Sequence, residues 1–183
     1  SKTSFFNFSF ISANDAAIVL AENIGGSENV GIGKCSLFSI TGDNTNNNVN
    51  LHTGKHNVAI GVDCLYSNKI GNFNVALGYK SLYLNEQSYN TAIGYECLLN
   101  NIIGAKNVAI GYQSLLAQTT GDSNIAVGER AGCGLTTGHG NIIIGQGSGQ
   151  AAITGGCNVG VGYQNYLSLT SGGCNIAMGY RAL

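Results

Sequence analysis

The sequence repeats one five-residue unit nine times. Asn57-Val-Ala-Ile-Gly61 returns seven times, ending at Asn175-Ile-Ala-Met-Gly179, in steps of 17, 16, 17, 17, 17, 17 and 17 residues. A first copy, Asn29-Val-Gly-Ile-Gly33, lies 28 residues earlier, which is one period plus an insertion of 11 residues. Helical repeats need 30 or more residues per unit, so this period excludes them and predicts a stack of short coils.

We number the positions of each coil from its Asn, which is position zero. Position one is β-branched in all nine copies, position three is Ile, Leu, Val or Met, and position two is Ala or Gly in eight of nine. Residues two apart share one face of a strand. We therefore expect positions one and three to fill the core, and position two to face outward where another backbone comes close.

The remaining positions of each coil predict turns and a second strand. Gly at position four ends the first strand, and a Gly three residues before the Asn, in eight of nine copies, marks another turn. The return half reads Tyr-x-Ser-Leu, as in Tyr79–Leu82, which predicts a second short strand. Repeated Asn at one corner predicts side-chain amides that bond from coil to coil.

These features predict an all-β fold, a parallel β-solenoid or β-roll of nine coils. Residues 29–183 form the repeat domain, with an insertion loop at 43–54, and residues 1–28 form an N-terminal capping or docking segment. A spacing of ~4.8 Å per coil gives a rod of roughly 40 Å. The last copy is cut short at Leu183, which favours a piece of a longer fibre.

Composition excludes several classes of partner. Only 9% of residues are charged and the net charge is −1, so no basic field exists for nucleic acid. No run reaches the 18 or more apolar residues of a membrane span, so we expect no membrane insertion. The six Cys match neither a zinc site nor a redox pair, and we expect free thiols. Cys157 and Cys174 lie one coil apart, within disulfide range, but parallel neighbours seldom reach the required torsion.

Motifs for catalysis or metal binding are weak. The Gly-rich segment before Lys34 lacks the P-loop spacing, and Asp43 begins no complete EF-hand loop. His52 and His56 are four apart in the insertion, where exposed loop residues are the simpler interpretation than a metal pair. A short column of Thr and Ser from Thr120 to Ser171 could order water, as in ice-binding proteins, or bond locally in turns. We therefore expect no catalytic, cofactor or metal residue and no enzyme.

The repeated Asn-Val-Ala-Ile-Gly, with its Ser-containing return and Gly turn, resembles the YadA-like head repeat of trimeric autotransporter adhesins. It is also similar to repeats in fibre proteins of phages and giant viruses. The resemblance covers residues 29–183 and implies a homotrimer of left-handed β-rolls used for attachment. It implies that Val58 and Ile60 fill the roll while small residues face the trimer axis: Ala59, Ala76, Ala92, Ala109, Ala126 and Ala177.

The coils of this chain are longer than those of the bacterial heads, and the chain has six Cys. Both features favour a viral fibre assembled in a reducing cytoplasm, hence a location on the virion surface, with a bacterial cell surface as the alternative. The function expected is a structural and adhesive segment of a trimeric surface fibre that attaches to a host. The alternative is a purely architectural stalk or capsid-associated protein without its own ligand.

Recognition is expected where the repeat is broken. The insertion occurs once and carries hydrogen-bonding groups for a host glycan or protein receptor, at Asp43, Asn46, Asn48, His52, Lys55 and His56. If the role is architectural, neighbouring capsid proteins are the partners instead. A second irregular stretch, Glu129–Gln150, replaces the usual Tyr and Leu of the return half and is the other candidate.

Overall fold

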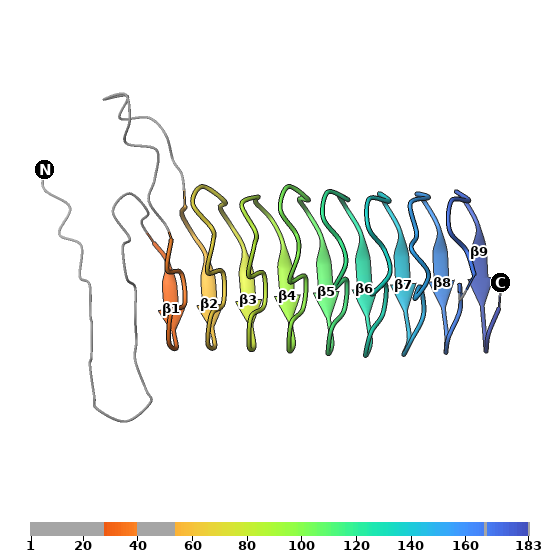
Figure 1. Ribbon diagram of the computed structural model, residues 1–183, viewed down its shortest axis with the longest axis horizontal. Coiled ribbons are helices and arrows are strands. Elements are labelled where there is room, and N and C mark those ends of the chain that lie inside the picture. Colours follow the sequence, from red (N-terminus) through yellow and green to blue (C-terminus); the bar gives the residue numbers. More distant parts are fainter. Residues whose placement is uncertain (1–27, 40–53, 167, 183) are drawn as a thin grey trace, which may run out of the picture.

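The computed structural model describes residues 28–39, 54–166 and 168–182, so all but the last residue of the capping segment predicted at 1–28 and most of the insertion lie outside the described residues. The described chain winds into a parallel β-solenoid with one nine-stranded sheet and no helix, as the repeat predicts (Figure 1). Each strand has three residues: β1 Val30–Ile32, β2 Val58–Ile60, β3 Val75–Leu77, β4 Thr91–Ile93, β5 Val108–Ile110, β6 Ile125–Val127, β7 Ile142–Ile144, β8 Val159–Val161 and β9 Ile176–Met178.

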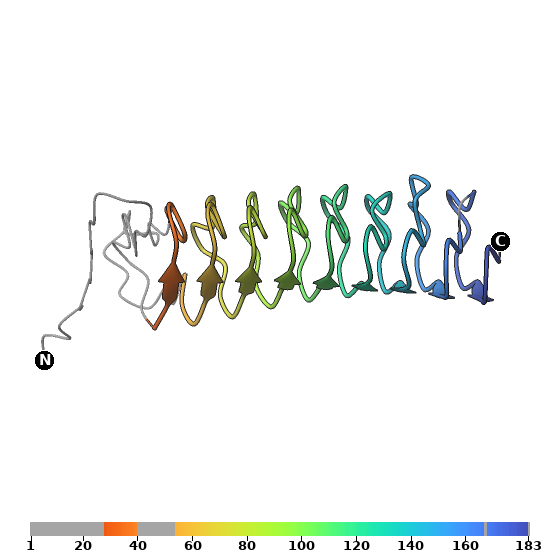
Figure 2. The ribbon, with the colours of Figure 1, turned by 90° about the horizontal axis from the view of Figure 1, so that it is seen from below.

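The strands stack in chain order and in register. Ala59 of β2 pairs with Ala76 of β3, for example, and Ala109 of β5 pairs with Ala126 of β6. All nine strands lie along one side of the stack, and the return segments lie along the other (Figure 2). Each coil therefore has one β wall and one wall made of turns.

The expected second strand is absent from the return segments that the structure describes. Positions six and eight of most coils have a positive φ, as at Lys80 with 52° and Leu82 with 53°, and a chain with alternate left-handed residues cannot extend as a strand. Twenty-two described residues other than Gly have φ between 49° and 65°, and none is Val, Ile or Thr. Because β-branched side chains tolerate this backbone worst, the return segment excludes the residues that dominate the strands.

The roll is thin, and this reverses the expected direction of the strand side chains. The inner column at position two, which includes Ala59 and Ala109, is fully buried within the single chain, whereas positions one and three are exposed or half-exposed. A Cβ built on Gly132, at position eight, would lie 3.5 Å from the Cβ of Ala126. The backbone that keeps position two small is thus the return segment of the same chain.

The six Ala predicted for a trimer interface therefore lie inside the roll: Ala59, Ala76, Ala92, Ala109 and Ala126 are 0% exposed and Ala177 is 4% exposed. The prediction that Val58 and Ile60 fill the interior is wrong for the same reason. The interior is instead made by the inner strand column and the Leu of position eight, such as Leu98 and Leu115.

Departures from the repeat compensate one another across this interior. Coil seven carries Ile143 in the inner column, and coils six and seven have Gly132 and Gly149 in place of the usual Leu. A Cβ on Gly149 would lie 2.9 Å from the Cδ1 of Ile143, so the Ile occupies the volume that the Leu side chains vacate. Coil eight shows the same kind of compensation. Its inner strand residue is Gly160, and the large ring of Tyr166 at position eight lies against it.

The Asn at position zero joins each coil to the next. The backbone N–H of Asn107 donates to Oδ1 of Asn90 at 2.9 Å, and Nδ2 of Asn107 donates to the carbonyl of Gly121 in the following coil at 2.9 Å. The same pattern recurs from Asn29 to Asn158, with small changes at single coils. The predicted coil-to-coil bonding by Asn is confirmed, with backbone groups as the main partners.

The compensation in coil eight generates a test. Gly160→Ala places a Cβ 2.5 Å from Cε2 of Tyr166, so we expect a loss of about 1–3 kcal/mol in the free energy of unfolding measured in urea. Adding Tyr166→Leu recreates the Ala–Leu pair of other coils, and the double variant should be more stable than the sum of the single changes by about 1 kcal/mol or more.

Gly31→Ala is the matched control, because it creates that same pair with Leu37 and should be nearly neutral. If the changes in the free energy of unfolding caused by Gly160→Ala and Tyr166→Leu were strictly additive, the two positions would not share one interior.

Candidate functional site

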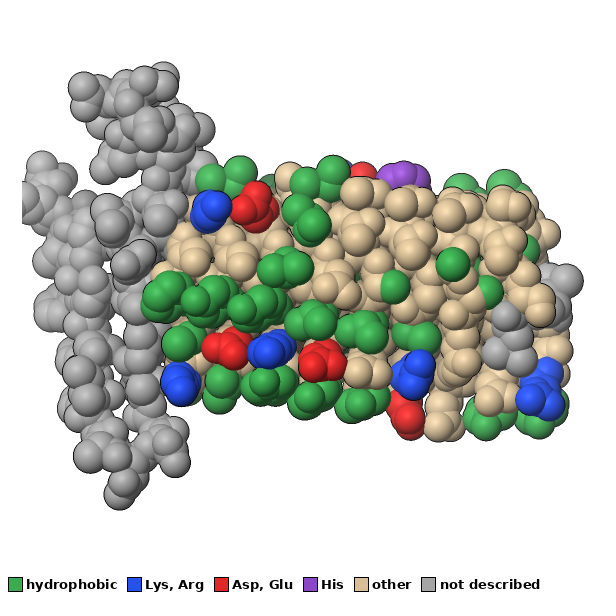
Figure 3. Space-filling model, in the orientation of Figure 1, with side chains coloured by type: hydrophobic (Ala, Val, Ile, Leu, Met, Phe, Trp, Pro, Cys, Tyr) green, Lys and Arg blue, Asp and Glu red, His purple; other side chains and the backbone are tan. Residues whose placement is uncertain are grey.

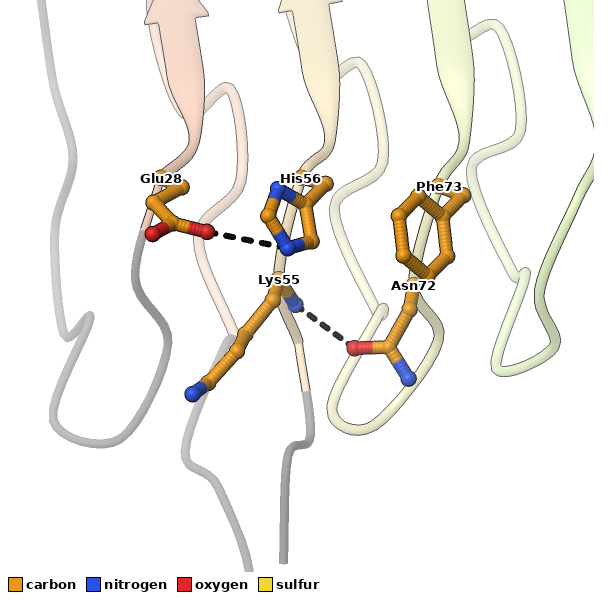
Figure 4. Close-up of a pocket in the computed structure, with 5 residues that line it drawn as sticks. All are labelled: Glu28, Lys55, His56, Asn72 and Phe73. Atoms are coloured by element: carbon orange, nitrogen blue, oxygen red, sulfur yellow. Dashed lines mark hydrogen bonds and ion pairs between the residues drawn. The ribbon is translucent and has the colours of Figure 1, made fainter.

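A cavity of about 510 Å³ lies beside the first three coils, next to the point at which the described chain resumes at residue 54. It is lined by Glu28, Lys55, His56, Asn72 and Phe73 (Figure 4). Lys55 and His56 belong to the predicted recognition loop. Its other residues, Asp43, Asn46, Asn48 and His52, lie outside the described part of the chain.

His56 is the centre of this cavity. Its Nε2 lies 2.9 Å from Oε2 of Glu28 in the preceding coil, and its ring stacks on Phe73 of the following coil with a centroid distance of 4.7 Å. Phe73 stacks in turn on Tyr89 at 5.2 Å. The row exists because one position, directly before the Asn, recurs once per coil and carries Glu28, His56, Phe73 and Tyr89 in succession.

A second row, one residue earlier in each coil, is polar. The backbone N–H of Lys55 donates to Oδ1 of Asn72 at 2.7 Å, and the backbone N–H of Asn72 donates to Oγ of Ser88 at 2.9 Å. The cavity therefore combines an aromatic wall with a carboxylate, an imidazole and amide groups (Figure 4). Such a set suits hydrogen bonding to a polar ligand.

The aromatic wall limits what the cavity can recognise. The ring faces that meet within the stack of His56, Phe73 and Tyr89 are covered, so these rings offer a ligand mainly their edges. A sugar ring normally lies on an exposed aromatic face. The described residues also contain no group of three or more His, Cys, Asp or Glu that could hold a metal ion.

The third His is far from this cavity along the rod. His139, in coil six, accepts the backbone N–H of Asp122 through Nδ1 at 3.0 Å. The structure thus brings Lys55 and His56, which belong to the predicted recognition loop, together with Glu28, Asn72 and Phe73, which sequence reasoning did not predict.

The outer strand face is a second candidate surface. Positions one and three of the strands point away from the interior, and they include Val30 at 47%, Ile32 at 46% and Ile144 at 38% exposure. Thr91 is the single polar residue among the eighteen outward positions of the nine strands. Sequence reasoning identified these columns but assigned them to the core, so it missed the surface.

The irregular coils Glu129–Gln150 are less distinctive as a surface than the repeat suggested. Gly132 and Gly149 are buried against Ile143, so their departure from Leu concerns packing. Outside the roll, Nε2 of Gln146 donates to Oε2 of Glu129 at 3.0 Å. Figure 3 shows few charged side chains on this half of the rod, whereas charges of opposite sign alternate along the other half.

Hydroxyls of the Thr-rich turns bond from one coil to the next. Oγ1 of Thr154, which belongs to the column of Thr and Ser weighed for water ordering, donates to the carbonyl of Thr170 at 3.2 Å. In the neighbouring column, Oγ1 of Thr136 donates to the carbonyl of Ile153 at 3.4 Å.

All six Cys are free thiols, as expected from the sequence. Cys64 and Cys97 are buried in the wall of the roll, where burial raises the pKa of Cys64 to about 11 and that of Cys97 to about 12. Cys157 and Cys174 are exposed on consecutive coils at the position before the Asn. The thiols therefore form a protected group and an accessible group.

Comparison of the chain with known protein families, with curated proteins and with solved structures gives no match. Within the described ranges no helix is long and apolar enough to cross a membrane. The surfaces described above therefore carry the functional argument.

The two groups of thiols should differ in reactivity. At pH 8 an aromatic disulfide reagent should label Cys157 and Cys174 in the native protein, because their exposed thiols are accessible to the reagent. Cys64 and Cys97 should stay unlabelled until the protein is denatured, since their raised pKa values leave almost no thiolate below about pH 10. Peptide mapping by mass spectrometry gives the measurement, and rapid native labelling of Cys97 would contradict the buried assignment.

Proposed function

We propose that this chain is a rigid structural segment of a surface fibre or spike, that it assembles as a homotrimer, and that it takes part in attachment to a host. The proposed location is the virion surface, with a bacterial cell surface as the alternative. The proposed partners are two further copies of the chain and a host glycan or protein receptor.

The outer strand face is the observation that carries this proposal. Soluble monomers rarely expose a continuous apolar patch of more than a few hundred Å². Nine coils at ~4.8 Å and strands of three residues give a strip of roughly 40 by 10 Å, or about 400 Å². The strip runs from β1 to β9, and Ile176 and Met178 at its end are 71% and 70% exposed. A flat apolar strip along a rod is suited to side-by-side packing with further copies.

The bonding between coils supports a mechanical role. Each strand pairs with its neighbours in register, and the Asn at position zero adds side-chain bonds between coils along the stack. Buried amides with satisfied bonds fix one geometry, since any shift leaves donors and acceptors unpaired in the interior. Such a stack is a suitable shaft for a fibre.

Attachment is assigned to the cavity at Glu28, Lys55, His56, Asn72 and Phe73, because it is a polar site. None of these residues recurs at the same position in another coil. It also adjoins the end of the insertion, because Lys55 and His56 follow directly on the predicted loop at 43–54.

A purely architectural protein is the second candidate, and one observation favours it. The aromatic residues of the cavity stack on one another, so the rings offer edges to a ligand and hold neighbouring coils together. On this view the cavity is a by-product of coil stacking, and the chain is a spacer whose partners are copies of itself and neighbouring capsid proteins.

Assembly through the strand face is tested with two lysine substitutions. Ile110→Lys places a charge on the exposed strand face, so we expect light scattering to show monomers where the unchanged protein gives trimers at micromolar concentration. Gln113→Lys, on the return wall of the same coil, should leave the trimer intact. Equal behaviour of the two variants would contradict the strand face as the interface, and a monomeric unchanged protein would overturn the proposed trimer.

Attachment is tested by binding of the labelled protein to a glycan array and to a panel of cultured cells. His56→Asn removes the imidazole from the cavity and keeps a residue that accepts a positive φ, so binding should fall at least tenfold. His139→Asn changes an exposed His in coil six and serves as the control. Binding that is absent for every probe, or unchanged in His56→Asn, would favour the architectural candidate.

A further inference from the structure

Two exposed ridges border the outer strand face, one at each end of the strands. The first rim is the position directly before the Asn, with His56, Phe73, Tyr89, Lys106, Ser123 and Cys157 on successive coils, apart from Gly140 in coil seven. The second rim is position five, with Val62, Tyr79, Tyr95, Tyr112, Glu129 and Tyr163, apart from Gln146 in coil seven.

Both rims carry ladders of stacked rings. On the first rim Phe73 and Tyr89 stack at 5.2 Å, and Tyr89 is 56% exposed. On the second rim Tyr79, Tyr95 and Tyr112 stack at 5.2 and 5.3 Å, and Tyr112 is 47% exposed. Exposed aromatic rows on both sides enlarge the apolar surface beyond the strip, toward the ~800 Å² per partner of a stable interface.

The two rims change character at adjacent coils, although the strand lies between them: the run of aromatic residues ends at Tyr89 in coil four on the first rim and at Tyr112 in coil five on the second. In coil three the first rim carries Phe73 and the second carries Tyr79. In coil four they carry Tyr89 and Tyr95, so both rims are aromatic in these two coils. In coils six and seven neither rim carries an aromatic residue. Coil five pairs the cation Lys106 with the ring of Tyr112, a combination that attracts when the cation lies over the ring face.

Symmetry connects this match to assembly. When identical rods surround an axis parallel to the rod, equal coils lie at equal height, and each contact joins one rim to the other rim of the next copy. An antiparallel pair that overlaps along all nine coils would instead place the aromatic coils three and four against the non-aromatic coils seven and six. The matching of the rims therefore favours the parallel arrangement.

We propose that, in the assembly, the first rim of each copy packs on the second rim of the next copy, coil on equal coil. This rests on the proposed homotrimer and specifies its contacts: aromatic rows meet in coils three and four, and Cys157 of one copy faces Tyr163 of its neighbour. The partner is a second copy of this chain in the same orientation.

The native Cys157 makes the contact measurable. In a Tyr163→Cys protein that also carries Cys174→Ser, mild oxidation with diamide should join Cys157 of one copy to the new thiol of the next. Non-reducing gel electrophoresis should then show covalent dimers and trimers in more than half of the protein. Positions 157 and 163 lie beyond opposite ends of β8 in one chain, six residues apart, so a disulfide cannot join them within that chain.

Two controls isolate the rims. Cys174→Ser alone should remain monomeric on the gel after oxidation, and so should Gln164→Cys with Cys174→Ser, because position six lies on the return wall beyond the second rim. Light scattering of the reduced proteins measures assembly independently of cross-linking.

The outcomes separate this inference from the proposed function. Covalent trimers in the Tyr163→Cys protein alone support the rim contact. A trimer by light scattering without cross-linking, or with equal cross-linking of the Gln164→Cys control, overturns the rim contact and leaves the trimer standing. Monomers by light scattering at every concentration overturn both.

Discussion

The thickness of the roll governs the rest of the structure. One strand and one return segment enclose an interior that in most coils holds one small strand residue, the Leu of position eight and a Ser or Cys of position seven, together with buried Asn side chains. No room remains for a second large side chain, so the bulky residues of the strand point outward. The return wall reaches the interior only with left-handed residues at positions six and eight, which is why Leu rather than Ile fills that wall. The exposed apolar face is thus a consequence of how little the interior can contain.

The architecture was predictable because repetition restricts the choices strongly. The period, the parallel stacking in register and the bonding between Asn residues all follow from one unit repeated at a fixed spacing. The direction of the strand faces did not follow, since positions one, two and three are all apolar, and a period of two does not say which side is inside. The exchange of Ile143 with Gly132 and Gly149, and of Gly160 with Tyr166, held the answer. A larger side chain at one position can compensate for a smaller one at another only if both lie in the same interior.

The candidate cavity was predictable in part. Lys55 and His56 attracted attention because they follow the insertion, but Glu28, Asn72 and Phe73 come from the coils on either side. They meet His56 because residues one period apart lie side by side, a relation visible only when the columns are aligned. The expected second strand failed for a different reason. The return segment has the apolar pattern of a strand, but its positive φ values are a tertiary requirement, shown in the sequence only by the absence of Val, Ile and Thr at positions six and eight.

Because every coil bonds only to the coils before and after it, the hydrogen bonds of this stack are oriented along its length. The bond from Asn124 to Asn107 and that from Asn141 to Asn124 are successive links of one line. A tensile force applied at the two ends would load these links in series, and the weakest junction would part while the remainder kept its shape. A force that bends the rod would instead stretch one wall and compress the other. A single roll should therefore resist buckling under compression better than it resists being pulled apart along its axis.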